Sequence, residues 1–239
     1  MRALILHSIF LLGLLGGAGC TGYAPSGTAG VAVTEGDRAL RAGEAEAAVA
    51  AYRRALDGAP RNPVALHGLA RAYSARGDVE AALGIYAGLE FGAPSYFGRA
   101  RSDCAIVLDI AADDRKRKGD LEGELRLLER LGEVARGSDG YDLEGRLRRA
   151  RLAGGEHSLA TRRDERAESL YRAVLRDHSQ NLDAVVGLAA ALQAQNRNDE
   201  AAALLSAAAQ AHPGSPAIHR AIDRLSQLRY PTPPANASP

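Results

Sequence analysis

The sequence predicts an all-α solenoid of antiparallel helix pairs that ends in a capping helix. Its composition favours helices, because alanine, leucine and arginine fill long stretches, aromatic residues make up only 5% of the chain and tryptophan is absent. The chain also repeats itself with a 34-residue period near both of its ends. Such a period is typical of stacked helical pairs, because no single pair can bury its apolar face alone.

The charge balance argues against a surface built mainly to attract nucleic acid. The 239 residues include 30 Lys+Arg and 29 Asp+Glu, which leaves a formal net charge of +1. Counterion release from a polyanion requires clustered positive charge, and the totals provide little excess. We therefore expect no nucleic-acid partner.

Residues 1–19 are typical of a secretory signal peptide. Arg2 gives a positive start, and an apolar stretch follows that is too short for a comfortable membrane span. The stretch ends in Gly17-Ala18-Gly19-Cys20, which resembles a bacterial lipobox, although Gly17 stands where leucine is usual. The resemblance implies that Cys20 is lipidated. Ordinary cleavage, which would give a soluble periplasmic protein, is the alternative.

The residues after Cys20 predict a tether. Residues 20–30 are rich in glycine, serine, proline and threonine, so we expect a flexible link between the lipid and the folded body. By resemblance to Gram-negative lipoproteins, Thr21 implies sorting to the periplasmic face of the outer membrane. Three acyl chains, palmitate among them, would anchor the protein firmly.

Residues 31–229 form the predicted helical domain, and its period can be followed directly. Four residues of the first copy recur 34 positions later: Gly43, Ala48, Tyr52 and Pro60 as Gly77, Ala82, Tyr86 and Pro94. Four residues near the other end recur with the same offset: Ala167, Tyr171, Val174 and Ser179 as Ala201, Leu205, Ala208 and Pro213. This pattern resembles the tetratricopeptide repeat (TPR), which implies a right-handed superhelical solenoid.

The clearest copy predicts the packing within a repeat. Its first helix carries Leu66, Leu69, Ala70 and Tyr73, and its second helix carries Ala82, Tyr86 and Leu89. Gly77 is expected to adopt a left-handed conformation and Asp78 to cap the next helix. Asn62-Pro63 and Ser215-Pro216 each place a capping side chain before a proline at the first helical position.

The middle of the chain, about residues 95–165, fits the period less well. The Gly119-Asp120 turn follows Gly77-Asp78 at an offset of 42 positions instead of 34, so we expect the helix before it to be about two turns longer. A further pair is predicted from Tyr141 to Ala153 and from Arg163 to Asp177, separated by Gly154-Gly155. A helical insertion without repeat geometry is the alternative.

The end of the domain is predicted to be a capping helix from Pro216 to Leu228. The proline-rich residues 230–239 cannot continue it and are expected to be a disordered tail. Asn236-Ala237-Ser238 matches a glycosylation sequon, which we interpret as chance in a bacterial lipoprotein.

The sequence contains no recognisable catalytic or metal site. No nucleophile elbow, phosphate-binding glycine loop or thiol motif is present, and the six histidines lack metal-ligand spacing. Cys104 is expected to be a small core residue. The run from Asp113 to Lys118 is interpreted as a solvated helix end, with a docking patch as the alternative. We therefore expect no catalysis, cofactor, metal or small-molecule substrate.

The TPR resemblance implies that the first helices of the pairs line a groove for a peptide or helix of a partner protein. Matching the groove positions of the family selects nine residues: Asp37, Arg41, His67, Arg71, Ser74, Asp183, Ala190, Gln193 and Ala194. Ordinary solvated surface is the alternative for each.

Together with the apparent lipobox, this suggests a lipid-anchored adaptor similar to pilotins and to assembly factors of pili, secretins or the outer membrane. The alternative is a periplasmic structural module that organises an envelope or cell-wall enzyme.

Overall fold

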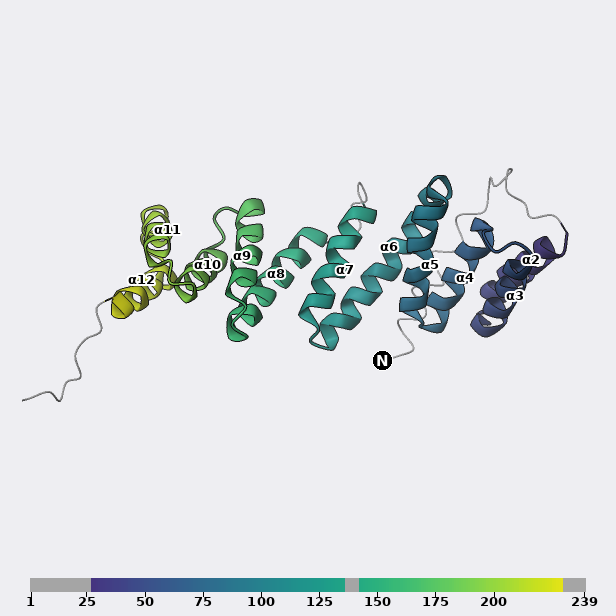
Figure 1. Ribbon diagram of the computed structural model, residues 1–239, viewed down its shortest axis with the longest axis horizontal. Helices are drawn as coiled ribbons and strands as arrows, with labels where there is room; N and C mark the ends of the chain where they lie inside the picture. Colours follow the sequence, from purple (N-terminus) through teal and green to yellow (C-terminus); the bar gives the residue numbers. More distant parts are fainter. Residues whose placement is uncertain (1–26, 136–141, 230–239) are drawn as a thin grey trace, which may run out of the picture. The chain divides into compact units, whose positions relative to one another are not determined.

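The computed structural model describes residues 27–135 and 142–229, and within them the chain forms helices and no strand (Figure 1). The all-α prediction is therefore confirmed for the described chain. The predicted signal peptide, Cys20 and the predicted tail lie outside the described residues. In order, the helices are α2 (Thr28–Ala42), α3 (Ala45–Gly58), α4 (Pro63–Arg76), α5 (Val79–Gly92), α6 (Pro94–Arg117), α7 (Leu121–Val134), α8 (Leu143–Ala160), α9 (Asp164–Asp177), α10 (Leu182–Ala194), α11 (Asn198–Ala211) and α12 (Pro216–Arg229).

The first described helix begins earlier than the sequence predicted. α2 starts at Thr28, so the end of the segment expected to be a tether is helical. The Thr34 hydroxyl donates a hydrogen bond to the Gly30 carbonyl at 3.0 Å within this first part of α2. The prediction failed here because small residues such as Ala29 and Gly30 give no hydrophobic periodicity that would distinguish a helix from a tether.

The turns between paired helices follow the 34-residue period. Gly43 ends α2 with φ of 78°, and Gly77 ends α4 with φ of 91°, so both adopt the left-handed conformation that favours glycine. The Gly77 N–H donates to the Ser74 carbonyl at 3.0 Å. The prediction for Gly77 is confirmed.

Helix capping was predicted correctly at Asn62 and wrongly at Asp78. The Asn62 side chain accepts hydrogen bonds from the Val64 and Ala65 N–H groups at 3.0 and 3.3 Å. The Asp78 carboxylate makes no capping bond and instead accepts a hydrogen bond from Arg76 Nε at 2.7 Å. The Asp78 carboxylate therefore pairs with the nearby Arg76 guanidinium instead of the N–H groups at the start of α5.

Two other polar side chains lie at helix starts. Asp120 Oδ1 accepts from the Gly123 N–H at 2.9 Å at the start of α7. This hydrogen bond is the main reason why the pKa of Asp120 lies below its usual value. The predicted cap Ser215 is weaker, because its Oγ lies 3.5 Å from the Ile218 nitrogen.

The chain packs as two compact units. The first comprises residues 1–113 and 130–138, and the second comprises residues 114–129 and 139–239. The division runs through α6 and α7, inside the region that the sequence marked as irregular. In the first unit, a core cluster gathers residues of α2, α3 and α4: Ala32, Val33, Ala39, Ala48, Val49, Tyr52, Ala55, Ala65, Leu69 and Ala72.

A tyrosine between two glycines organises the first unit. The fully buried Tyr52 of α3 packs against Gly36 of α2 and Gly68 of α4. A Cβ atom at Gly36 would lie 2.7 Å from Tyr52 Cζ, and one at Gly68 would lie 2.2 Å from Tyr52 Cε1. Both first helices therefore approach the ring more closely than any residue with a side chain permits.

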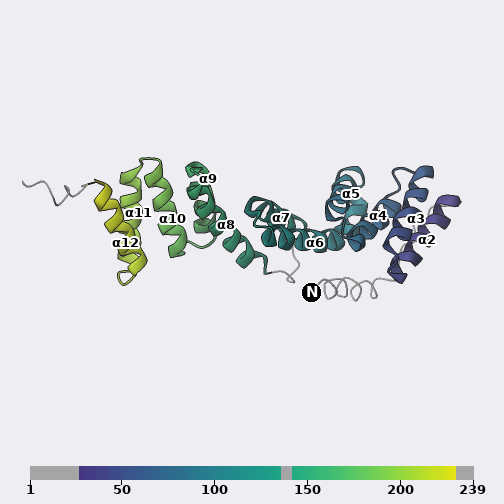
Figure 2. The ribbon, with the colours of Figure 1, turned by 90° about the horizontal axis from the view of Figure 1, so that it is seen from below.

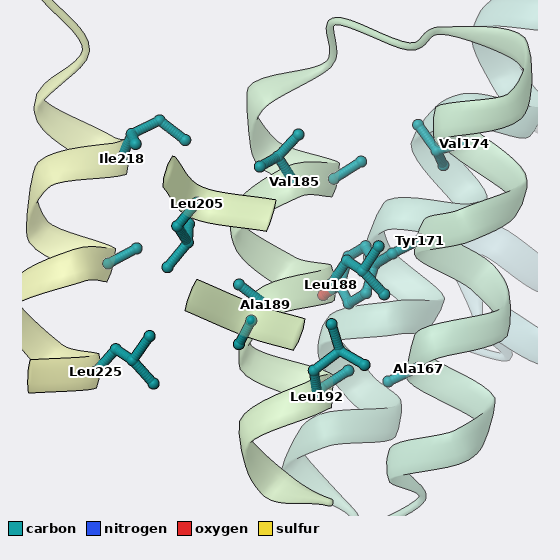
Figure 3. Packing of buried hydrophobic residues seen from close by; sticks show 14 residues of the cluster. Ala167, Tyr171, Val174, Val185, Leu188, Ala189, Leu192, Leu205, Ile218 and Leu225 are labelled. Atoms are coloured by element: carbon teal, nitrogen blue, oxygen red, sulfur yellow. The ribbon is translucent and has the colours of Figure 1, made fainter. Parts of the chain in front are cut away.

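The same arrangement recurs in the second unit around Tyr171 of α9. A Cβ atom at Gly155 would lie 2.6 Å from Tyr171 Cζ, and one at Gly187 of α10 would lie 2.3 Å from it. Figure 3 shows Tyr171 beside Leu188 in the core of this unit. α8, α9 and α10 therefore repeat the packing of α2, α3 and α4.

This packing corrects the prediction for Gly154-Gly155. The two glycines do not separate a helical pair, because α8 continues through them to Ala160. Glycine inside a helix costs about 1 kcal/mol relative to alanine. Here Gly155 is required by the neighbouring Tyr171 ring. The alternative of an insertion without repeat geometry is wrong for α8 and α9.

The predicted long helix is confirmed in α6. Its 24 residues compare with 14 in α4. α6 also begins at Pro94, before the position that the 34-residue period predicts from Pro63. Cys104 is buried in α6, and burial raises the pKa of its thiol to about 11, as expected of an inert core cysteine.

α12 closes the second unit as predicted, and it ends slightly later than expected, at Arg229 instead of Leu228. It buries Ile218, Ala221 and Leu225 in the same cluster as α10 and α11. Figure 2 shows α10, α11 and α12 side by side. Because α11 runs antiparallel to both neighbours, α10 and α12 point the same way.

Candidate functional site

In the first unit, three of the predicted groove residues surround one hydroxyl group. Tyr52 donates a 2.6 Å hydrogen bond to Asp37 Oδ1 on α2. Burial raises the pKa of Tyr52 most and the Asp37 carboxylate raises it further, while the positive charges of Arg71 and Arg41 oppose both effects. Asp37, Arg41 and Arg71 therefore face the same surface of α2 and α4.

His67 and Arg71 on α4 share a carboxylate from α6. His67 Nε2 lies 3.0 Å from Asp103 Oδ2, and Arg71 Nε lies 3.4 Å from the same oxygen. Burial alone would raise the pKa of Asp103, but the hydrogen bond from His67 and the charges of His67 and Arg71 hold it below its usual value. The other His67 nitrogen, Nδ1, lies 3.4 Å from the Tyr96 hydroxyl.

These contacts determine which of the side chains remain accessible to a partner. The His67 side chain is only 15% exposed and contacts Asp103 and Tyr96. It therefore lies beneath the surface and positions the residues around it. Arg71 is 44% exposed, and Arg41 is exposed with no ion pair in the described chain. Ser74 follows one turn after Arg71 and is half-buried. The cationic part of this surface is therefore formed by Arg41 and Arg71.

Sequence reasoning missed Tyr96 and Asp103. Both lie on α6, which starts ahead of the repeat frame, so their places could not be obtained by adding one period to known positions. Pro94 carried a usable signal, because proline is favoured at the first position of a helix.

In the second unit, two predicted residues line a hollow of about 330 Å³ between α10 and α12. They are Ala190 and Gln193. The other residues of the lining are Val186, Ala189, Ala221, Arg224 and Gln227. Asp183 is exposed at the start of α10, away from this hollow, and Ala194 is exposed at the end of α10 and does not line it.

The contribution of α12 to this hollow was missed. α12 was predicted only as a solubilising cap, yet Arg224 and Gln227 follow Ala190 and Gln193 by one full period of the repeat. The 34-residue period could therefore have identified Arg224 and Gln227 from the sequence. The Nε2 atom of Gln193 is buried and has no hydrogen-bond partner in the described chain.

The acidic and basic run at the end of α6 is largely paired within itself. Asp114 contacts Lys118 at 2.6 Å and Arg117 at 3.3 Å, and Arg115 contacts Asp120 at 3.1 Å. These contacts favour a solvated helix end over a docking patch.

Residues 27–135 and 142–229 contain neither a metal-binding cluster nor a membrane-spanning helix. No group of three or more His, Cys, Asp or Glu side chains there is placed to hold a metal ion. No helix there combines the length and apolar character needed to cross a membrane.

The repeated helix pairs and the family comparison define the class of protein. A family model for the tetratricopeptide repeat matches residues 39–96 and 159–225, which is more than half of the chain. The chain therefore belongs to the tetratricopeptide repeat family. Members of this family are generally non-catalytic modules, and the fold indicates a scaffold for protein–protein interaction.

Several solved structures are similar to the chain. A thermophilic TPR protein of Thermus thermophilus is 24% identical, with 84% of this chain and 98% of that chain covered and a TM-score of 0.33. The MamA protein is 16% identical, with 86% and 97% covered and a TM-score of 0.37. The TPR2AB domain of yeast Sti1, in a complex with pHSP90, is 17% identical, with 84% and 83% covered and a TM-score of 0.35. No curated protein matches the sequence significantly.

Proposed function

We propose that this protein is a lipid-anchored adaptor at the periplasmic face of a bacterial outer membrane. In this proposal it resembles a pilotin or another assembly factor of a pilus, a secretin or the outer membrane. The observation that carries the proposal is the coexistence of Gly17-Ala18-Gly19-Cys20 with a tetratricopeptide body. Acyl chains on Cys20 would hold the protein at the membrane, and the helical pairs would hold the partner.

The binding surfaces proposed are the first-helix faces of the two units. In the first unit, the exposed guanidinium groups of Arg41 and Arg71 would contact polar or acidic side chains of the partner. In the second unit, the hollow between α10 and α12 is lined by both apolar and polar side chains. Both surfaces accept a peptide or a helix without any catalytic group.

The anchor is tested by metabolic labelling with a palmitate analogue. We expect the full-length chain to be labelled and to fractionate with the outer membrane, and Cys20→Ala to lose the label and become soluble in the periplasm. Equal labelling of the two chains would remove the lipid anchor from the proposal.

The binding surface is tested by crosslinking in cells. A photoreactive amino acid placed at Arg41 or Arg71 is expected to recover the same envelope-assembly component. The matched control is Arg54, an exposed arginine on α3. Recovery of a cell-wall enzyme instead would favour the structural module over the assembly factor, and equal recovery from Arg54 would reject the proposed surface.

A further inference from the structure

His67 and Arg71 of α4 contact the same oxygen atom of Asp103 on α6. The two residues lie one helical turn apart, so their side chains point to the same side of α4. His67 Nε2 is 3.0 Å and Arg71 Nε is 3.4 Å from Asp103 Oδ2. The attraction between Arg71 and Asp103 therefore depends on the charge of the imidazole that shares the carboxylate.

The two residues that share Asp103 differ in their freedom to move. The largely buried His67 ring lies edge to face with the rings of Tyr86 and Tyr96, at centroid separations of 6.0 and 5.8 Å. Its Nδ1 atom lies 3.4 Å from the Tyr96 hydroxyl. The imidazole is therefore fixed beside Asp103. The half-exposed Arg71 side chain has solvent on one side, so it can leave the carboxylate without displacing other residues.

Within the described chain, His67 is the member of this cluster whose charge changes near neutral pH. Histidine ordinarily gains or loses its proton between about pH 5 and pH 8. Burial would raise the pKa of Asp103, but the hydrogen bond from His67 and the charges of His67 and Arg71 hold it below its usual value, so Asp103 stays ionised in that range. Burial raises the pKa of Tyr86, and it raises that of Cys104 to about 11, so both stay neutral.

The charged and titratable groups that α2 and α3 add to this surface are Asp37, Arg41 and Tyr52. Burial raises the pKa of Tyr52 most, and its hydrogen bond to Asp37 raises it further, so the Tyr52 hydroxyl keeps its proton. Carboxylates and guanidinium groups ordinarily keep their charges between about pH 5 and pH 8. The Tyr96 hydroxyl is the other titratable group that α6 places beside His67.

We propose that protonation of His67 releases Arg71 from Asp103, so that the surface of α2 and α4 binds acidic partners more tightly at low pH. A neutral imidazole donates one N–H group to Asp103 and leaves the negative charge for Arg71. An imidazolium supplies the same hydrogen bond together with a full positive charge. The net attraction of Arg71 for the carboxylate then falls, because the two cations repel each other.

Protonation also changes the net charge of the surface. Asp37 and Asp103 balance the positive charges of Arg41 and Arg71, so a protonated His67 leaves one positive charge in excess. One added charge at a solvent-exposed surface strengthens the binding of a carboxylate by about threefold to tenfold. This consequence rests on the proposed function, because it assigns the partner to the surface of Arg41 and Arg71.

Relaxation of the arginine side chains tests the release directly. The chain is labelled with ¹⁵N at arginine Nε, and the heteronuclear Overhauser effect of Arg71, assigned from Arg71→Lys, is recorded from about pH 5 to about pH 8. We expect Arg71 to be ordered at the upper end of this range and mobile at the lower end. The midpoint should coincide with that of the His67 ring-proton resonances. The same order of Arg71 at both ends would overturn the proposal.

Two variants separate the imidazole charge from the hydrogen bond. In His67→Gln the amide can donate to Asp103 but cannot gain a charge, so Arg71 is expected to stay ordered at every pH. In Asp103→Asn the shared negative charge is absent, so Arg71 should be mobile at every pH. The matched control is His178→Gln in the second unit, where His178 Nε2 lies 3.4 Å from Glu144 Oε1, and it should leave the Arg71 transition unchanged. A transition that persists in His67→Gln would contradict the role of His67.

Arg130, which pairs with Glu90 and Glu133, provides an internal reference in the same spectra and is expected to keep its order throughout. The measurements do not involve the partner protein. A failure of the release of Arg71 is therefore distinguishable from a failure of the proposed adaptor function, which the crosslinking tests separately.

Discussion

Two buried tyrosines that are equivalent in the repeat differ in the hydrogen bonding of their hydroxyl groups. Tyr52 and Tyr86 occupy the same position in successive repeats, and both are almost completely buried. The Tyr52 hydroxyl donates to Asp37, whereas the Tyr86 hydroxyl has no hydrogen-bond partner in the described chain. The repeat explains the difference, because the residue one period after Asp37 is Arg71, which cannot accept a hydrogen bond.

This difference predicts opposite effects for the same substitution. Tyr52→Phe removes a hydrogen bond to a carboxylate, so we expect a loss of about 1–2 kcal/mol in the free energy of unfolding. Tyr86→Phe removes an unpaired buried hydroxyl, so stability should be unchanged or should rise by up to about 1 kcal/mol. Urea unfolding followed by circular dichroism measures both variants. A larger loss for Tyr86→Phe than for Tyr52→Phe would contradict the assignment of their hydroxyl environments.

The 34-residue period predicted only some of the residues of the candidate site. Asp37, Arg41 and Arg71, which the period selected, lie close to the same Tyr52 hydroxyl, because α2 and α4 keep the 34-residue frame. The period could not identify Asp103 as the carboxylate that holds His67 and Arg71. That contact depends on where α6 starts, and α6 starts at Pro94, before the position that lies one period after the start of α4 at Pro63.

At the scale of helices, close approach determines which positions must be glycine. Gly155 and Gly187 flank Tyr171 just as Gly36 and Gly68 flank Tyr52. In each trio the tyrosine lies midway in sequence between its two glycines. The sequence shows the glycines, but their spacing alone does not distinguish a helix break from a close helix crossing. The prediction of a break at Gly154-Gly155 was wrong because tertiary packing overrides the low helix propensity of glycine.

A pair of glycine-to-alanine substitutions tests this account. A methyl group at Gly187 would lie 2.3 Å from the Tyr171 ring, so Gly187→Ala is expected to cost about 1–3 kcal/mol through overpacking. Gly84 in α5 has nothing within 4 Å of an added Cβ, so Gly84→Ala should stabilise the protein by about 0.5–1 kcal/mol through helix propensity. Thermal unfolding compares the two. A neutral or stabilising Gly187→Ala would show that the ring has room to move.

At the scale of the whole chain, stability is expected to be local. Within each unit, helices pack against the next helix in sequence or against the one after it, as α2 packs with α4 and α10 with α12. The two described core clusters likewise belong to different units, one around Tyr52 and one around Tyr171. A stack of this kind is stabilised by each repeat and by its contacts with neighbours, so a defect in one place need not open the rest.

Hydrogen exchange provides the test of locality. Tyr171→Ala empties the space between Gly155 and Gly187, and the loss of a large buried aromatic ring costs about 3–5 kcal/mol. We expect amide exchange to accelerate in α8, α9 and α10 while α3 and α4 keep the protection of the unmodified chain. Tyr52→Ala should give the converse pattern, with faster exchange in α2, α3 and α4 and unchanged exchange in α10. If either substitution accelerated exchange equally in both units, the chain would unfold as one cooperative body, because only a shared unfolding step transmits the loss of one ring to both cores.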